Sequence, residues 1–287
     1  MSRVAYVNGR YVAHRDAAVH IEDRGYQFAD GVYEVCEIAD GQVIDMTGHL
    51  DRLARSLNEL AIGWPMHRSS LERVMFEVIR RNRVRNGLVY LQVTRGVAPR
   101  DHVFPNPVVK PALVITAKST DPQVFAAKAR TGLKVVTTPE SRWNRVDIKT
   151  VGLLPNVLAR QAAREQGAQE AWFVDPDGSV KEGAATNAWI VTMDGVLVTR
   201  PADHGILRGI TRATTMKVAE ALNMPVEERA FTVDEAKAAR EAFVTSASSV
   251  VMPVVAIDGH VIANGEPGTI AGRLRAAFFD VAEKREA

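Results

Sequence analysis

The chain has 287 residues, of which 46% are hydrophobic and 24% are charged, so it is long enough for about two globular domains with buried cores. Its 36 basic and 34 acidic residues give a net charge of +2, which excludes a strong electrostatic preference for nucleic acid or for a membrane surface. The single cysteine, Cys36, excludes an internal disulfide and favours a reducing compartment. Because the sequence shows neither an apolar stretch typical of a signal peptide nor one long enough to span a bilayer, we expect a cytoplasmic protein.

The first 120 residues predict strands, then two helices, then further strands. Asn8-Gly9 and Asp40-Gly41 each separate two strand-like segments, and both pairs are typical of tight β-hairpin turns. Apolar residues recur at helical spacing from Leu50 to Leu60 and again from Leu71 to Ile79. Residues 88–94 and 112–116 then read as buried strands.

The second half of the chain begins after Asp121-Pro122, which interrupts the strand pattern. We place a linker at residues 121–126. Beyond it we expect a strand at 133–138, a helix at 153–166, several β-rich runs, and helices at 210–222 and 270–282. The predicted class is therefore α+β, with a smaller domain over residues 1–120 and a larger domain over residues 127–287.

Lys149 lies in a strand-like apolar segment, residues 146–151. Burial disfavours the charged ammonium group, so a lysine in such a segment is a candidate nucleophile. The alternative is a side chain with a buried stem and a charged end in solvent. The segment taken alone favours this alternative.

Three further segments have residue types suited to an anionic ligand. Glu182 begins a run of small residues that would let a ligand approach the backbone, although the run also reads as a simple loop. Leu207 to Thr211 opens a predicted helix whose free N–H groups could bind phosphate, unless Thr211 only caps the helix. The polar run of Ser246, Ala247 and Ser248 could add donors to an anion or could be an ordinary loop.

Three basic residues, Arg52, Arg100 and His102, are candidates for binding an anionic group. Arg52 falls between core leucines, where it could pair with a phosphate charge or with a neighbouring acid. Arg100 and His102 lie in a loop rich in glycine and proline, directly after a predicted strand. Both are suitable types for binding a carboxylate, and the alternative is a solvated basic loop.

In their order and spacing these segments resemble the class IV aminotransferases, which are the fold-type IV pyridoxal-phosphate enzymes. The resemblance rests on Glu182 to Asn187, Leu197 to Thr199 and Leu207 to Arg212, with Trp189 where the family usually has phenylalanine or tyrosine. Five further segments are similar to one branch of the family, the D-amino acid transaminases: Asp23 to Phe28, Asp30 to Val35, the surroundings of Arg52, Thr94 to Pro105, and Asp147 to Lys149. The arrangement of Arg100 and His102 is the most branch-specific of them.

The resemblance implies two mixed α/β domains with pyridoxal 5′-phosphate bound at their interface. Lys149 would form the Schiff base and move the α-proton, and Glu182 would keep the pyridine nitrogen protonated. Leu207 would pack on the ring. The phosphate would be held by Arg52, Gly209, Ile210, Thr211, Ser246, Ala247 and Ser248, although Ala247 lacks the hydroxyl that relatives can carry there. Tyr33, Arg100 and His102 would bind the substrate carboxylate, the last two from the other subunit of a homodimer. The role of Glu34 stays open.

The implied reaction is the reversible transfer of an amino group from a D-amino acid, such as D-alanine, to pyruvate or 2-oxoglutarate. Three alternatives share the fold and cofactor: an aminodeoxychorismate lyase, a branched-chain L-amino acid transaminase and an (R)-amine transaminase. Arg100 and His102 argue against them. A catalytically silent pyridoxal-phosphate-binding protein is a further alternative, against which Lys149 and Glu182 argue together. We expect no metal site, because the seven histidines include no pair at the spacing of a helical metal motif.

Overall fold

The computed structural model describes residues 3–286, which divide into two compact units. Unit 1 contains the described residues up to Asp121, the segment Ile148–Gly152 and residues 283–286. Unit 2 contains Pro122–Asp147 and Leu153–Ala282. Where we expected a linker over residues 121–126, helix α4 (Pro122–Thr131) begins instead, because proline is well tolerated in the first turn of a helix.

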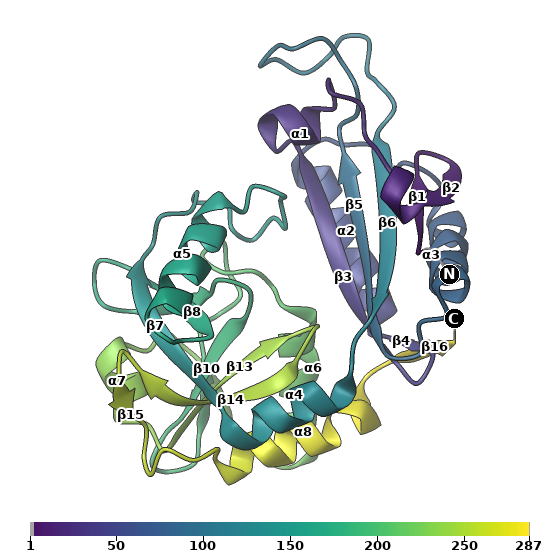
Figure 1. Cartoon of the computed structure of the whole chain (residues 1–287). Helices are drawn as coiled ribbons and strands as arrows, with labels where there is room; N and C mark the ends of the chain where they lie inside the picture. The colour runs from purple at the N-terminus through teal and green to yellow at the C-terminus, as the bar shows by residue number, and fades with distance from the viewer. Residues whose placement is uncertain (1–2, 287) are drawn as a thin grey trace. The chain divides into compact units, whose positions relative to one another are not determined.

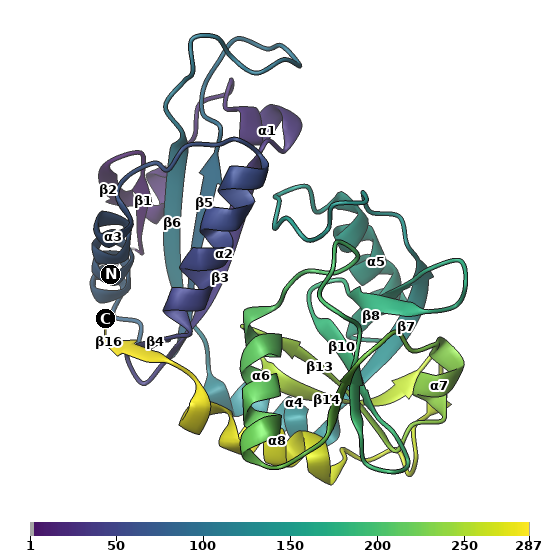
Figure 2. The same cartoon turned by 180° about the vertical axis from the view of Figure 1, so that it is seen from behind.

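Unit 1 is built on an antiparallel sheet of seven strands in the order β16-β4-β3-β5-β6-β1-β2. Helices α2 (Met46–Glu59) and α3 (Arg68–Asn82) pack on this sheet (Figure 2). Its strands are β1 (Val4–Val7), β2 (Arg10–Ala13), β3 (Gly31–Ala39), β4 (Gln42–Ile44), β5 (Gly87–Thr94), β6 (Ala112–Ser119) and β16 (Lys284–Glu286). A short helix α1 (Arg24–Phe28) and a 3-10 turn η1 (His14–Asp16) complete the unit.

The turns and the core of unit 1 follow from local sequence. Both predicted hairpins are confirmed, and Asn8-Gly9 and Asp40-Gly41 have the positive φ angles that these tight turns require. The leucines of α2 face β3, where Leu50 and Leu53 are fully buried. Each such side chain stabilises the fold by about 1.5–3 kcal/mol relative to an exposed one.

Unit 2 contains a mixed sheet of nine strands in the order β12-β11-β10-β13-β14-β7-β8-β9, with β15 paired to β14. Its strands are β7 (Leu133–Pro139), β8 (Glu170–Val174), β9 (Val180–Gly183), β10 (Asn187–Val191), β11 (Leu197–Thr199), β12 (Val226–Glu228), β13 (Glu241–Ser246), β14 (Val250–Ile257) and β15 (His260–Val261). Besides α4, its helices are α5 (Leu154–Glu165), α6 (Ile210–Ala221), α7 (Val233–Lys237) and α8 (Thr269–Val281). Helices α4 and α8 both pack against β14 (Figure 1).

The segment around Lys149 is not the strand that its apolar character predicts. Residues 146–151 are irregular, with a turn at Val146 and Asp147 and one isolated bridge between Thr150 and Val32. The Tyr33 amide donates to the Lys149 carbonyl at 3.0 Å, and the Val151 amide donates to the Gly31 carbonyl at 3.1 Å. Because Ile148 is buried in the core of unit 1, the segment joins that unit although its neighbours in sequence belong to unit 2.

Among residues 3–286 no helix is long and apolar enough to cross a membrane.

Candidate active site

Lys149 lies over an aromatic pair in unit 1. Its Nζ atom is 4.2 Å from the centre of the Tyr33 ring, which stacks on Tyr90 at 5.6 Å. The Lys149 amide also donates to the Ser56 hydroxyl at 3.4 Å. The backbone of this lysine is therefore fixed on both sides, and its amine is held against an aromatic face by a cation–π contact.

Tyr90 stays neutral beside this amine. Burial, with a smaller effect of Tyr33, raises the pKa of Tyr90 to about 12. Its hydroxyl donates to the Gln92 side chain at 2.6 Å. Tyr90 therefore supports, in its neutral form, the Tyr33 ring that Lys149 contacts.

Glu34 is completely buried on the opposite face of β3 from Tyr33, since consecutive strand residues alternate in direction. Arg52 donates to both Glu34 oxygens at 2.7 Å, and Nδ1 of His49 lies 2.8 Å from the second oxygen. Burial by itself would raise the pKa of Glu34, but Arg52 and His49 lower it to about 2. Arg52 therefore forms a buried ion pair with Glu34, which is 18 residues away, and not a surface pair with a neighbouring acid.

The loop between β5 and β6 carries Arg100 and His102, and both side chains are exposed. They gather around Phe28 of α1: the Arg100 guanidinium carbon is 4.6 Å from the ring centre, and the His102 ring lies at 5.4 Å. Figure 1 shows this loop beside α1 at one end of the unit. The three residues expected to bind a carboxylate thus fall into two groups, one around Phe28 and one formed by Tyr33 with Lys149.

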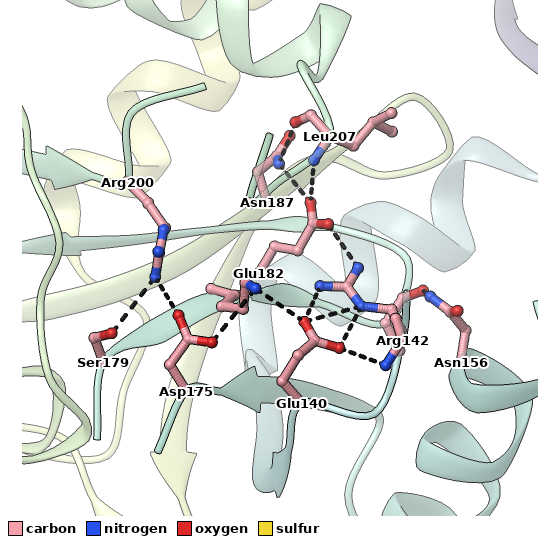
Figure 3. Close-up of polar contacts among 12 residues, drawn as sticks. Glu140, Arg142, Asn156, Asp175, Ser179, Glu182, Asn187, Arg200 and Leu207 are labelled. Carbon is pink, nitrogen blue, oxygen red and sulfur yellow. Dashed lines mark hydrogen bonds and ion pairs between the residues drawn. The ribbon is translucent and has the colours of Figure 1, made fainter. Parts of the chain in front are cut away.

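In unit 2, Glu182 on β9 is 4% exposed and accepts hydrogen bonds from three donors. Arg142 donates to one carboxylate oxygen at 2.7 Å, while the Asn187 side-chain amide and the Leu207 amide donate to the other at 3.0 and 3.1 Å (Figure 3). A carboxylate that accepts from several donors is stabilised in its ionised form. Glu182 is therefore a buried, oriented anion.

Arg142 connects Glu182 to a wider ionic network. It donates to both oxygens of Glu140, and its side chain is only 7% exposed. The network continues from Glu140 through Lys181 and Asp175 to Arg200, so charges alternate along it (Figure 3). Burial raises the pKa of Glu140, but the bonds from Arg142 more than offset this and lower it.

The N-terminus of α6 has the geometry of an anion site. Gly209 is the N-cap, and Ile210 and Thr211 are the first two helical residues, so the alternative in which Thr211 caps the helix is wrong. The N-cap makes no side-chain hydrogen bond to α6. A Cβ atom at Gly209 would collide with the Asn187 side-chain oxygen, so this position requires glycine. Free N–H groups in the first turn of a helix bind phosphate well.

Ser246, Ala247 and Ser248 lie where β13 ends and a turn begins. All three are half-buried. The Ser246 hydroxyl is 3.3 Å from that of Ser248 and 2.8 Å from that of Ser249. The hydroxyl groups of this segment are thus clustered.

Comparison with known proteins decides the family. The family described as "Amino-transferase class IV" matches residues 31–257. A D-alanine aminotransferase of Staphylococcus epidermidis is 39% identical over 95% of both chains, and one of Bacillus licheniformis is 37% identical over 94% of both. The chain belongs to the class IV aminotransferases.

Solved class IV structures have the same fold. A branched-chain amino acid aminotransferase of Escherichia coli superposes with a TM-score of 0.90 at 25% identity, covering 98% of this chain and 95% of that one. A branched-chain amino acid aminotransferase of T.th., solved with pyridoxamine 5′-phosphate, gives a TM-score of 0.89 at 26% identity and covers 98% of this chain and 94% of that one. The expected α+β architecture of the fold-type IV enzymes is confirmed.

Two residues that contact the candidate site residues were not identified from the sequence: Arg142, which pairs with Glu182, and His49, which lies beside Arg52. Arg142 gave no signal, since nothing in its neighbourhood predicts that it is buried against a residue 40 positions away. His49 could have been found, because it lies three residues before Arg52 and therefore on the same face of a helix. Within residues 3–286 no cluster of histidine, cysteine, aspartate and glutamate side chains could hold a metal ion.

Proposed function

We propose that this class IV aminotransferase is a D-amino acid transaminase that uses pyridoxal 5′-phosphate. In the forward direction it would transfer the amino group of D-alanine to a 2-oxo acid such as 2-oxoglutarate. The assignment of this cofactor rests on Glu182, a buried carboxylate that accepts hydrogen bonds from three donors. The D-alanine specificity is supported by 39% identity to D-alanine aminotransferases, against 25–26% to the branched-chain enzymes.

The residues present fit the chemical groups of this cofactor. A protonated ring nitrogen needs a buried anion, which Glu182 supplies. A phosphate dianion needs converging donors, and the α6 terminus at Gly209, Ile210 and Thr211 supplies N–H groups. Arg52 and the segment of Ser246, Ala247 and Ser248 are the remaining proposed phosphate ligands, and Leu207 would contact the ring. Lys149 offers the amine that would hold the aldehyde carbon.

The chain's own residues would divide the reaction between binding and proton transfer. The cofactor, when bound, supplies an electron-withdrawing ring that stabilises negative charge at the substrate α-carbon. Lys149 Nζ would take the α-proton and return it later, acting as base and then as acid. Tyr33, Arg100 and His102 would hold the substrate carboxylate and turn one enantiomer's Cα–H bond toward the lysine.

We further propose a homodimer in which Arg100 and His102 serve the partner's site. Large apolar side chains are exposed around the loop that carries them, namely Ile21, Tyr26, Val103, Phe104 and Val108. Helix α5 also exposes Leu154, Val157 and Leu158 at helical spacing. Apolar patches of this kind mark association surfaces. We place the enzyme in the cytoplasm, in keeping with its single, free and buried Cys36.

A side-by-side assay tests the proposed substrate. D-alanine, L-leucine and (R)-1-phenylethylamine are each offered with 2-oxoglutarate, and turnover is measured. The proposal expects D-alanine to be the best donor and Lys149→Ala to abolish its turnover. Preference for L-leucine or for the amine would move the enzyme to another branch of the family, and full turnover by Lys149→Ala would exclude the proposed mechanism.

A further inference from the structure

We propose that Arg24 and Phe28 of helix α1 are positioning residues that hold Arg100 and His102 in place and thereby set the enzyme's preference for substrates with a carboxylate. This inference rests on the proposed function, because it takes Arg100 and His102 to be the carboxylate ligands. It assigns a purpose to the motif from Asp23 to Phe28, which has no direct role in the proposed chemistry.

Arg24 holds the backbone of the loop directly. It is 3% exposed, and its guanidinium donates to the Asp101 carbonyl at 2.6 Å and to the His102 carbonyl at 3.5 Å. These two carbonyls lie beside the side chains that would bind substrate. A buried arginine fork therefore fixes the backbone at the point from which Arg100 and His102 project.

Phe28 supports the side chains themselves. Its ring centre lies 4.6 Å from the Arg100 guanidinium, 4.8 Å from that of Arg24 and 5.4 Å from the His102 ring. Both substrate-binding side chains thus contact one aromatic ring. The cation–π attraction holds the Arg100 guanidinium on the ring, and the ring–ring contact holds His102, so Phe28 limits the rotamers that both side chains can adopt.

A buried ionic cluster fixes Arg24 in turn. Asp30 accepts from Arg24 at 2.8 Å and from Arg95 at 2.7 and 3.0 Å. Arg95 also donates to the carbonyls of Leu60 and Ala61, and its guanidinium lies 3.6 Å from the Phe104 ring centre farther along the same loop. Two arginines share one aspartate, so the cluster adds positive charge beneath Arg100, which favours an anionic substrate.

The start of α1 is locked to the end of β5. The Asp23 carboxylate accepts from the Gly25 amide at 2.8 Å and from the Thr94 hydroxyl at 2.9 Å. The Arg24 amide donates to the Gly96 carbonyl at 2.9 Å. A Cβ atom on Gly25 would collide with Thr94, so the helix can approach the strand only with glycine there. The motif therefore places Arg24 and Phe28 rigidly against an otherwise irregular loop.

The experiment compares the holoenzyme with its Arg24→Met, Arg24→Lys and Phe28→Leu variants, and with Arg15→Met as a control, since the Arg15 side chain is 81% exposed. KM and kcat are measured for D-alanine, and the rate is measured for (R)-1-phenylethylamine, which has no carboxylate. Hydrogen exchange of the amides in residues 97–110 is followed by mass spectrometry.

We expect Arg24→Met to raise KM for D-alanine by between about tenfold and a hundredfold, since small misplacements of substrate-positioning groups have effects of that size. Turnover of the amine should change less than threefold (about the level of ordinary surface effects), and loop amides should exchange faster. Arg24→Lys should recover part of the effect, Phe28→Leu should act in the same direction, and Arg15→Met should match the wild type.

Three results would overturn the inference: an unchanged KM in Arg24→Met, an equal loss for D-alanine and the amine, or unchanged exchange of the loop. If Arg24→Met does not fold, the inference is tested with Arg24→Lys and Phe28→Leu. The same comparison is made, between the change in KM for D-alanine and the change in the rate with the amine. A wild-type enzyme that ignores D-alanine would instead contradict the proposed function, and the exchange measurement would still show whether Arg24 fixes the loop.

Discussion

Arg142 shows how much depends on one buried side chain in unit 2. It satisfies Glu140 and Glu182 together, and both are shielded from solvent. Replacing it with methionine leaves two buried carboxylates without their shared cation. We expect Arg142→Met to lower the free energy of unfolding of the apoenzyme, measured with urea, by about 3 kcal/mol.

A matched control for Arg142 exists on the surface of α3. Arg80 also pairs with a glutamate, Glu77, but its side chain is 71% exposed. Arg80→Met should cause no measurable loss of stability, because exposed ion pairs contribute little. Adding Glu140→Gln to Arg142→Met should recover part of the loss. An equal loss of unfolding free energy in Arg142→Met and Arg80→Met would contradict a stabilising role for the buried network.

Glu34 makes a prediction about pH. Its pKa in the folded protein is about 2, below its usual value of 4.5, so its bonds to Arg52 and His49 stabilise the fold fully above about pH 4.5. That contribution fades as the pH falls from about 4.5 toward 2. Urea unfolding of wild type and Glu34→Gln should therefore differ by about 3 kcal/mol at pH 7 and by less at pH 3.5. A difference that grew on acidification would contradict the assignment.

At the scale of elements, the N-terminus of α6 depends on Gly209. A methyl group there displaces the Asn187 side chain, which donates to Glu182 and to the Leu207 carbonyl. We expect Gly209→Ala to destabilise the fold by about 1–3 kcal/mol through overpacking and to weaken binding of pyridoxal phosphate. Thermal unfolding of the apoenzyme and titration with the cofactor measure the two effects.

The control for Gly209 lies in α8 of the same unit. Gly272 is exposed, and a Cβ atom there meets open space. Gly272→Ala should stabilise the fold by about 0.5–1 kcal/mol, because alanine favours helix, and cofactor binding should be unchanged. If both alanine substitutions behaved alike, the close approach at Gly209 would not explain the site.

Elements that depend on local sequence could be predicted, whereas elements that depend on distant contacts could not. Hairpins at Asn8-Gly9 and Asp40-Gly41 depend on local turn chemistry, and the leucine spacing of α2 depends on one buried face, so both were predictable. The irregular segment of residues 146–151 has the apolar character of a strand, because a buried loop is as apolar as a buried strand. Strand β16 gave no signal, since Lys284 to Glu286 are polar and pair with β4 from the far end of the chain.

The candidate site divides in the same way. The sequence predicts the helix that begins at Ile210, and its residue pattern marks Glu182, which the structure buries. Distant partners could not be predicted: Arg142 and Glu182 lie 40 residues apart, and Arg24 reaches the carbonyl of Asp101 across 77. Such contacts join residues that are far apart in the sequence. They depend on the complete fold, so the pattern of nearby residues does not predict them.

At the scale of the whole molecule, the proposed dimer predicts complementation. Lys149→Ala and Arg100→Ala should each be inactive toward D-alanine. If Arg100 serves the partner's site, a mixed dimer contains one intact site, and refolding the two variants together should restore roughly a quarter of the wild-type activity. No recovery from a mixture that sedimentation shows to be dimeric would mean that both residues act within one chain.

We propose above that Lys149 and Glu182 hold pyridoxal phosphate for the turnover of D-amino acids. The most direct test is the visible absorption spectrum of the purified protein, supplied with pyridoxal phosphate and then mixed with D-alanine or L-alanine in separate samples. We predict a yellow band that D-alanine bleaches and L-alanine does not. A band that ignores D-alanine, or no band at all, would contradict the claim.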